Sequence, residues 1–295
     1  FSILFNFAAP LLAWIAGFYL AYLGFGGSIF YLGFFVGLLL SIAFFYRYFY
    51  GTKIINLYLL KSQKDIYKKI IPFFYVAVFG WLSGYGGNLF VAIFFDINFV
   101  GKLTLLLSFG SILQLILTAI NQAWAPRFFS YLRERSEIGA IHEINKINRN
   151  VYFFQSIVSS LSIVIILFFI FLTQNLFTLQ LGSFEEYSNY FLLILLGYSC
   201  LLPWYQCHNY LIFFDKGEEL SQITIKSGVL GMLIWIALMY FVGEAGIYIG
   251  FFIQMILRSS YMLFYAKKQW KITLPWFGYL LNFLLPVICL LLINT

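Results

Sequence analysis

The chain has 295 residues, of which 62% are hydrophobic and only 10% are charged, and its mean hydropathy is +0.90. This composition leaves too little polar surface to cover a soluble globule of this size, so it excludes a soluble protein and predicts a polytopic membrane protein. The formal net charge of +7 is interpreted as membrane topology and contact with anionic lipid headgroups, not as nucleic-acid binding.

Apolar stretches long enough to cross a hydrocarbon core about 30 Å thick recur along the whole chain. They cover about residues 2–23, 29–48, 71–95, 99–125, 151–173, 188–213, 221–242, 246–266 and 273–293. Backbone within lipid must satisfy its hydrogen bonds inside each segment. The sequence therefore predicts an all-α bundle of about nine transmembrane helices.

The charges of the connecting segments give an orientation, because Lys and Arg of short loops prefer the cytoplasm. With Phe1 inside, the inner loops hold the bases of residues 47–69, 127–149, 216 and 267–271. The outer loops hold Asp96, Glu185, Glu186 and Glu244, with Lys102 as their only base.

Two inner loops are long. Residues 51–70 mix Lys with Ile and Leu, and we expect them to be a basic cytoplasmic linker between two helical lobes. Residues 127–149 contain isoleucines spaced by three amid charges, which predicts a short helix lying on the membrane surface: Ile138, Ile141, Ile144 and Ile147.

One motif occurs twice, 217 positions apart, at Tyr31-Leu32-Gly33-Phe34-Phe35 and at Tyr248-Ile249-Gly250-Phe251-Phe252. Both copies open an apolar run that goes from outside to inside, as parallel repeats about an axis along the membrane normal require. We expect residues 1–50 to be the last two helices of an incomplete first lobe, 71–268 to be a second six-helix lobe, and 269–295 to be an additional transmembrane helix. The same offset places roughly 150 further residues, about four helices, ahead of Phe1.

The stretch from Trp81 to Arg133 resembles the start of the second lobe of Wzx-type polysaccharide (O-antigen) flippases. These belong with MATE exporters and lipid II flippases to the multidrug, oligosaccharidyl-lipid and polysaccharide exporter superfamily. The resemblance lies in a helix end followed by Pro and an aromatic pair, Ala119-Ile120-Asn121-Gln122-Ala123-Trp124-Ala125-Pro126-Arg127-Phe128-Phe129, and in the preceding helix pair. It implies a MATE-like two-lobe bundle in a bacterial inner membrane that moves an isoprenoid-pyrophosphate-linked oligosaccharide to the outer leaflet by ion-coupled alternating access. Other glycan-assembly membrane proteins would be partners.

Such a bundle needs cations for the pyrophosphate and amides for the sugar, and buried charges mark the candidates because each is costly in the bilayer. Arg258 lies near the middle of the run 246–266, with Gln254 one turn earlier, and a guanidinium can bind phosphate through two hydrogen bonds. The repeat offset places Arg258 on Ser41, so only the second lobe carries this charge. The alternative is an arginine that reaches to the inner interface.

Further polar residues are candidates for the same cavity. His208 is a candidate for ion coupling by titration near neutral pH, although a histidine hydrogen-bonded between helices explains it as well. Asn121, Gln122 and Asn88 are candidates to line a sugar path, and packing of helix ends explains them equally.

Gly80, Gly84, Gly86 and Gly87 fall within one predicted helix. Small residues permit close helix packing, and a run of them also provides a hinge on which one lobe rocks against the other.

Other functions are weighed against transport of a lipid-linked oligosaccharide. A MATE-type exporter of small molecules or of another lipid precursor is the nearest alternative. A membrane acyltransferase or glycan polymerase is less favoured, because the outer loops are too short to build a catalytic lid. A non-transporting scaffold is a further alternative. We expect no enzyme, no cofactor and no metal site. Cys200, Cys207 and Cys289 have neither the spacing of a metal site nor that of a disulfide framework.

Overall fold

The computed structural model describes residues 64–84, 86–134, 137–177 and 184–272, together with residues 39, 274, 275, 278, 280–282, 284, 287 and 288. The chain divides into two compact units, Phe1–Tyr67 and Lys68–Thr295, and nearly all described residues belong to the second. The predicted helix 2–23, all of 29–48 except residue 39, the first copy of the repeated motif and most of 273–293 lie outside the described residues. The nine-helix count and the repeat therefore stay predictions.

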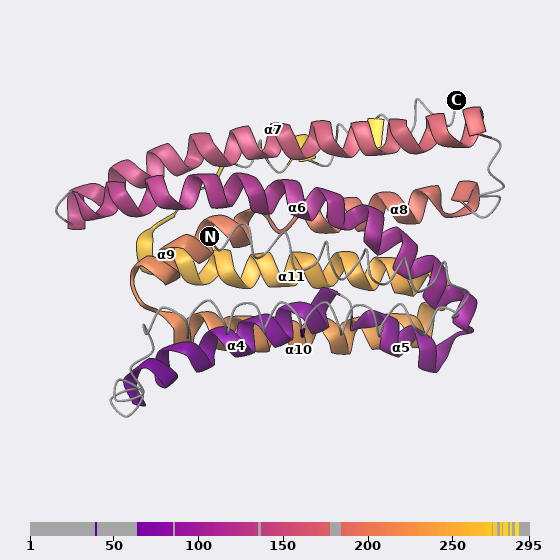
Figure 1. Ribbon diagram of the computed structural model, residues 1–295, viewed down its shortest axis with the longest axis horizontal. Coiled ribbons are helices and arrows are strands. Elements are labelled where there is room, and N and C mark those ends of the chain that lie inside the picture. Colours follow the sequence, from indigo (N-terminus) through magenta and orange to yellow (C-terminus); the bar gives the residue numbers. More distant parts are fainter. Residues whose placement is uncertain are drawn as a thin grey trace. The chain divides into compact units, whose positions relative to one another are not determined.

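The described part of the second unit consists of helices that run side by side along one direction (Figure 1). In chain order they are α4 (Lys64–Gly84), α5 (Gly87–Phe94), α6 (Ile97–Arg133), α7 (Glu137–Phe177), α8 (Phe184–Ser199), α9 (Leu202–Phe213), α10 (Gly217–Val242) and α11 (Glu244–Trp270).

Six stretches of the described chain are long and apolar enough to cross a membrane. They are Ile70–Phe94, Phe99–Arg133, Ile141–Phe168, Tyr190–Phe213, Gly217–Val242 and Glu244–Trp270. Each overlaps one of the predicted apolar runs. For this part of the chain, the prediction of a helical, multi-pass membrane protein is confirmed.

Two of these stretches are interrupted helices; the first break falls in the glycine run for which a hinge was one alternative prediction, and the second was not predicted. The first breaks between α4 and α5, where Leu89 donates its backbone N–H to the carbonyl of Gly86 in a tightened turn. The second breaks between α8 and α9, where Pro203 stands in the first turn of α9. Proline has no N–H to donate to the preceding turn and its ring crowds that turn, so the helix restarts there.

The prediction of a separate surface helix within residues 127–149 is wrong. The helix α6 continues through Arg133 and α7 begins at Glu137, so both helices extend beyond their apolar runs. Ile144 is fully buried, and Ile141 and Ile147 pack against the same core. The isoleucine spacing thus marks the inward face of a long helix, because a three-residue spacing fits a packed helix as well as an interfacial one.

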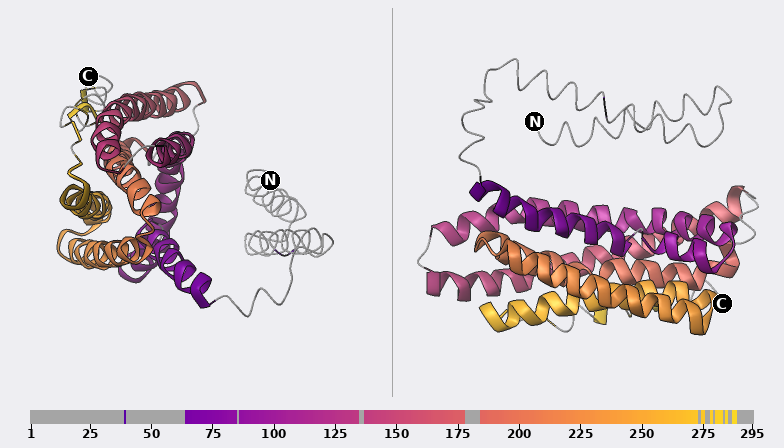
Figure 2. Two further views of the ribbon diagram at one scale, coloured as in Figure 1. Left: turned by 90° about the vertical axis from the view of Figure 1, so that its left-hand side faces the viewer. Right: turned by 90° about the horizontal axis from the view of Figure 1, so that it is seen from below.

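The span formed by α8 and α9 is the centre of the described bundle. In its most apolar stretch of 18 residues, 89% of the residues are buried. In the corresponding stretches of the other five spans, between 24% and 44% of the residues are buried. It packs against α6, α7, α10 and α11, and the view along the helices places it among them (Figure 2, left). The outer spans expose large apolar side chains, as lipid-facing helices do.

The second copy of the repeated motif organises the packing of α11. Gly250 lies against Trp235 of α10, so close that a Cβ there would come within 2.2 Å of the indole ring. Tyr248 stacks on Tyr190 at 4.6 Å between ring centroids, and Phe251 meets the rings of Tyr198 and Trp235 edge to face. The motif therefore serves helix packing in the described lobe.

The two ends of the bundle differ in charge. Arg133, Lys216 and Lys267 stand at helix ends on the left of Figure 1, whereas Asp96 and Glu244 stand at helix ends on the right. The segregation predicted from the sequence is thus present among the described residues. Which end faces the cytoplasm stays a prediction.

Candidate functional site

Arg258 lies at the middle of the 27-residue helix α11 and is turned into the bundle. Its side chain is only 9% exposed. The guanidinium carbon lies 4.6 Å from the ring centroid of Trp204 on α9, and a Cβ placed on Gly80 of α4 would lie 3.4 Å from its Nη2. The guanidinium is therefore held between α4, α9 and α11 and does not reach the helix end, in contrast to the interfacial alternative.

No counter-charge accompanies this arginine among the described residues. No Asp or Glu of that part of the chain pairs with it, and its buried Nε has no hydrogen-bond partner there. A charged side chain at the centre of a bilayer costs about 2.5–3.5 kcal/mol on insertion scales. The contact with the Trp204 ring is a cation–π interaction that offsets part of this cost.

Two further buried polar side chains near Arg258 lack partners. Gln254 is fully buried one turn earlier on α11, and neither its amide oxygen nor its amide nitrogen makes a hydrogen bond. Ser83 of α4 is buried with its hydroxyl unpartnered. Both face one strip of α10: Gly231 lies against Gln254, and Gly228 lies against Ser83.

We call Arg258, Gln254 and Ser83 the polar cluster. Buried polar groups in proteins nearly always have a hydrogen-bond partner. Three side chains with unmet hydrogen-bonding capacity in one region can therefore bind water or a polar ligand, and their donors and charge favour an anionic one.

His208 joins this region through Trp204. The two rings stack with centroids 4.6 Å apart and planes 21° apart, and Arg258 lies against the same indole. Sequence reasoning proposed Arg258 and His208 separately, and the structure connects them. The sequence reasoning did not identify Trp204, for which the only indication in the sequence was its position one turn before His208.

The predicted amides do not all belong to this region. Asn121 of α6 and Asn209 of α9 form a reciprocal pair, with distances of 3.0 Å and 3.4 Å between amide nitrogen and amide oxygen. Gln122 is exposed on the surface of α6, and Asn88 of α5 is half-buried with its Oδ1 unpartnered. The structure brings together Arg258, Gln254 and, through Trp204, His208, but it leaves Asn121 engaged elsewhere and Gln122 outside.

A second polar network was not predicted and is well satisfied. Tyr210 donates its hydroxyl to Oδ1 of Asn145 at 2.5 Å and accepts from Nδ2 of Asn148 at 2.9 Å. Trp124 donates to Oδ1 of Asn148 at 2.9 Å, and Asn145 donates to the carbonyl of Trp270 at 2.9 Å. These bonds tie α6, α7, α9 and α11 together near the basic end, which is a structural role.

The four candidate hinge glycines differ in their surroundings. A Cβ on Gly87 would lie 2.0 Å from the ring of Trp235, and one on Gly86 would lie 2.3 Å from the carbonyl oxygen of Leu82. A Cβ on Gly84 would have no atom within 4 Å. Close packing thus accounts for Gly86 and Gly87, while Gly84 is simply the last residue of α4, next to the break.

No protein family, curated protein or solved structure matches this chain. The resemblance to Wzx-type flippases therefore stays a prediction from the quoted motifs.

Proposed function

We propose that this protein is a flippase that moves an isoprenoid-pyrophosphate-linked oligosaccharide from the cytoplasmic to the outer leaflet of a bacterial inner membrane. The observation that carries the proposal is the buried guanidinium of Arg258, which has no counter-ion among the described residues. A cation kept at the centre of a membrane helix at such cost calls for an anion that binds there during function. A pyrophosphate supplies the charge and the acceptor oxygens for which a guanidinium is suited.

The neighbours of Arg258 fit the other parts of such a substrate. Gln254 and Ser83 offer amide and hydroxyl groups without partners, which suit sugar hydroxyls. Trp204 lies against the guanidinium and would hold it in place for the pyrophosphate. His208, stacked on that indole, is the residue through which we propose the site responds to a coupling proton.

Helix α4 gives a route to this site. Of the described helices, α4 packs least extensively on the others, and its small residues Gly80 and Ser83 cover Arg258 and Gly228. It also ends at the break before α5. Displacement of α4 about this break would expose the polar cluster to one side of the membrane at a time, as alternating access requires.

The proposal is tested by reconstituting the purified chain in liposomes with a fluorescent lipid-linked oligosaccharide and measuring its transfer between leaflets. We expect Arg258→Ala to abolish transfer, since the pyrophosphate would cross without its cation. Arg258→Lys should retain a fraction of the rate, because an ammonium keeps the charge but not the planar donor pair.

The matched control is Arg149→Ala, which removes an exposed arginine of α7 and should leave transfer unchanged. Transfer at the parent rate by folded Arg258→Ala protein would remove Arg258 from the mechanism. Transfer of a small cationic dye, but not of the oligosaccharide lipid, by the parent chain would favour the MATE-type alternative.

A further inference from the structure

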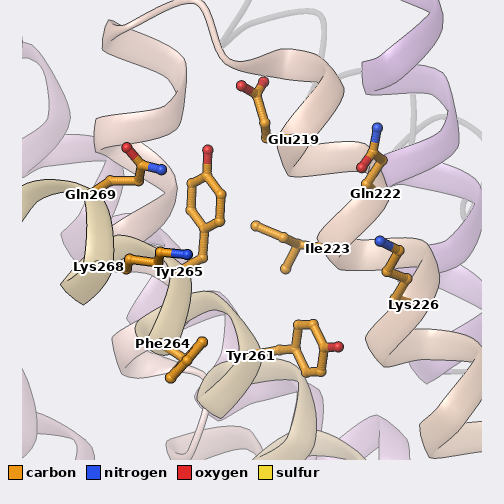
Figure 3. A pocket seen from close by; sticks show the side chains of 9 residues that line it. All are labelled: Glu219, Gln222, Ile223, Lys226, Tyr261, Phe264, Tyr265, Lys268 and Gln269. Carbon is orange, nitrogen blue, oxygen red and sulfur yellow. The ribbon is translucent and has the colours of Figure 1, made fainter.

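A pocket of about 270 Å³ lies between α10 and α11, near their basic end and away from the polar cluster. The residues that matter in its lining are Gln222, Ile223 and Lys226 of α10, and Tyr261, Phe264 and Lys268 of α11 (Figure 3). It opens at the surface of these two helices, where Gln222, Lys226, Phe264 and Lys268 are exposed.

The pocket is positively charged. Lys226 and Lys268 stand on opposite walls and direct their amino groups toward the space between them (Figure 3). Neither is paired with a carboxylate among the described residues. Glu219 also lines the pocket, but its carboxylate lies 3.8 Å from Nζ of Lys216, which offsets its charge.

An apolar surface continues from each lysine toward the middle of the bundle. On α10, Leu230 and Leu233 follow Lys226 at helical spacing and are 43% and 60% exposed. On α11, Phe264 precedes Lys268 by one turn and is 72% exposed. Lys268 stands in the last turn of α11 and Lys226 is the tenth residue of α10, so an anionic group between them would lie near Phe264, with the exposed leucines of α10 continuing toward the middle of the bundle. This arrangement matches a molecule that has an anionic head and hydrocarbon tails.

We propose that this pocket binds one anionic phospholipid from the leaflet at the basic end of the bundle. Its phosphate lies between Lys226 and Lys268, beside Phe264, and its acyl chains lie along Leu230 and Leu233. A lipid bound there joins α10 to α11 close to the end of the helix that carries Arg258. The proposal does not depend on what the protein transports.

The test is native mass spectrometry of the whole purified chain in detergent, titrated with phosphatidylglycerol or with phosphatidylcholine. We expect one phosphatidylglycerol to bind more tightly than the rest and more tightly than phosphatidylcholine. Lys226→Gln and Lys268→Gln should each weaken that binding about fivefold, the effect of one lysine at an anionic lipid surface. Lys226→Arg should bind as the parent does.

Lys267→Gln is the matched control, because Lys267 is exposed on the same helix turn but does not line the pocket. Equal losses in Lys267→Gln and Lys268→Gln would show diffuse charge attraction and overturn the site. Unchanged binding in the folded double variant of Lys226 and Lys268 would overturn it as well. Displacement of the lipid by millimolar inorganic phosphate alone would assign the pocket to a free anion and not to a lipid.

Discussion

At the residue scale, Trp204 determines how a buried charge is tolerated. Its indole lies against Arg258 on one helix and stacks on His208 of its own helix. A desolvated cation on an aromatic face gains about 2 kcal/mol, comparable with the insertion cost of the arginine. Without this ring, no hydrogen bond, ion pair or ring contact to Arg258 would remain among the described residues.

A double-mutant cycle between Trp204→Leu and Arg258→Met measures this contact. We expect a coupling free energy of about 1–2 kcal/mol in unfolding followed in mixed detergent micelles. The control cycle pairs Trp270→Leu with Arg258→Met, because twelve residues along one helix separate the two sites by roughly 18 Å. Additive effects in the first cycle would show that the indole does not hold the guanidinium.

At the element scale, glycines decide how closely the helices approach. Trp235 of α10 lies against Gly87 of α5 and Gly250 of α11, and its Nε1 donates to the carbonyl of Ile247 at 2.7 Å. The glycine of the repeated motif, which has no side chain, thus leaves the space that the large buried ring of Trp235 occupies. Helices in lipid associate through such close contacts, since lipid tails are as apolar as the side chains they replace.

We expect Gly250→Ala and Gly87→Ala each to destabilise the protein by about 1–3 kcal/mol, because the added methyl overlaps the Trp235 ring. Gly84→Ala should leave stability unchanged, since a Cβ there meets no atom within 4 Å. Thermal unfolding in detergent compares the three variants. Equal loss in all three would indicate a general intolerance of this region and not a contact with Trp235.

Gly84 also permits a test of function, because the structure assigns it no packing role. If the break before α5 acts as the hinge for α4, Gly84→Leu should slow lipid transfer in the liposome assay while the unfolding temperature stays near that of the parent. Loss of folding in this variant would point to packing.

At the scale of the whole molecule, the six described spans alternate in direction and gather most of their basic residues at one end, whereas Asp96 and Glu244 stand at the other. Such a distribution orients a membrane protein with its basic end in the cytoplasm. Arg258, at the middle of α11, then lies within the membrane and not at either surface.

Labelling with a membrane-impermeant thiol reagent tests this orientation. Lys267→Cys should react only after cells are permeabilised, whereas Asp96→Cys should react in intact spheroplasts. The described native thiols, Cys200 and Cys207, are buried and give little background. The reversed pattern would invert the topology and the direction of the proposed transport.

Much of the described fold was predictable because its signals are local. Apolar length located the six described spans, and the bases at their ends gave their alternation. The break before α5 lies in the glycine run for which a hinge was only one alternative, and the break before α9 at Pro203 was not predicted, because such residues also occur inside unbroken membrane helices. The prediction of a surface helix around Ile144 was wrong for a similar reason, because isoleucines spaced by three residues occur on packed helices as well as on surface helices.

Local patterns in the sequence are enough to predict a helical membrane protein, its six described candidate spans, the basic character of one end, and the place of Arg258 at the middle of a span. Helix packing, in contrast, brings Arg258, Trp204 and His208 together, pairs Asn121 with Asn209, leaves Gln122 exposed, and places Lys226 and Lys268 in the lining of one pocket. The physical reason is that a membrane helix is apolar on every side, so its sequence carries no amphipathic signal to fix its rotation. Which polar residues share a site follows from how the helices pack.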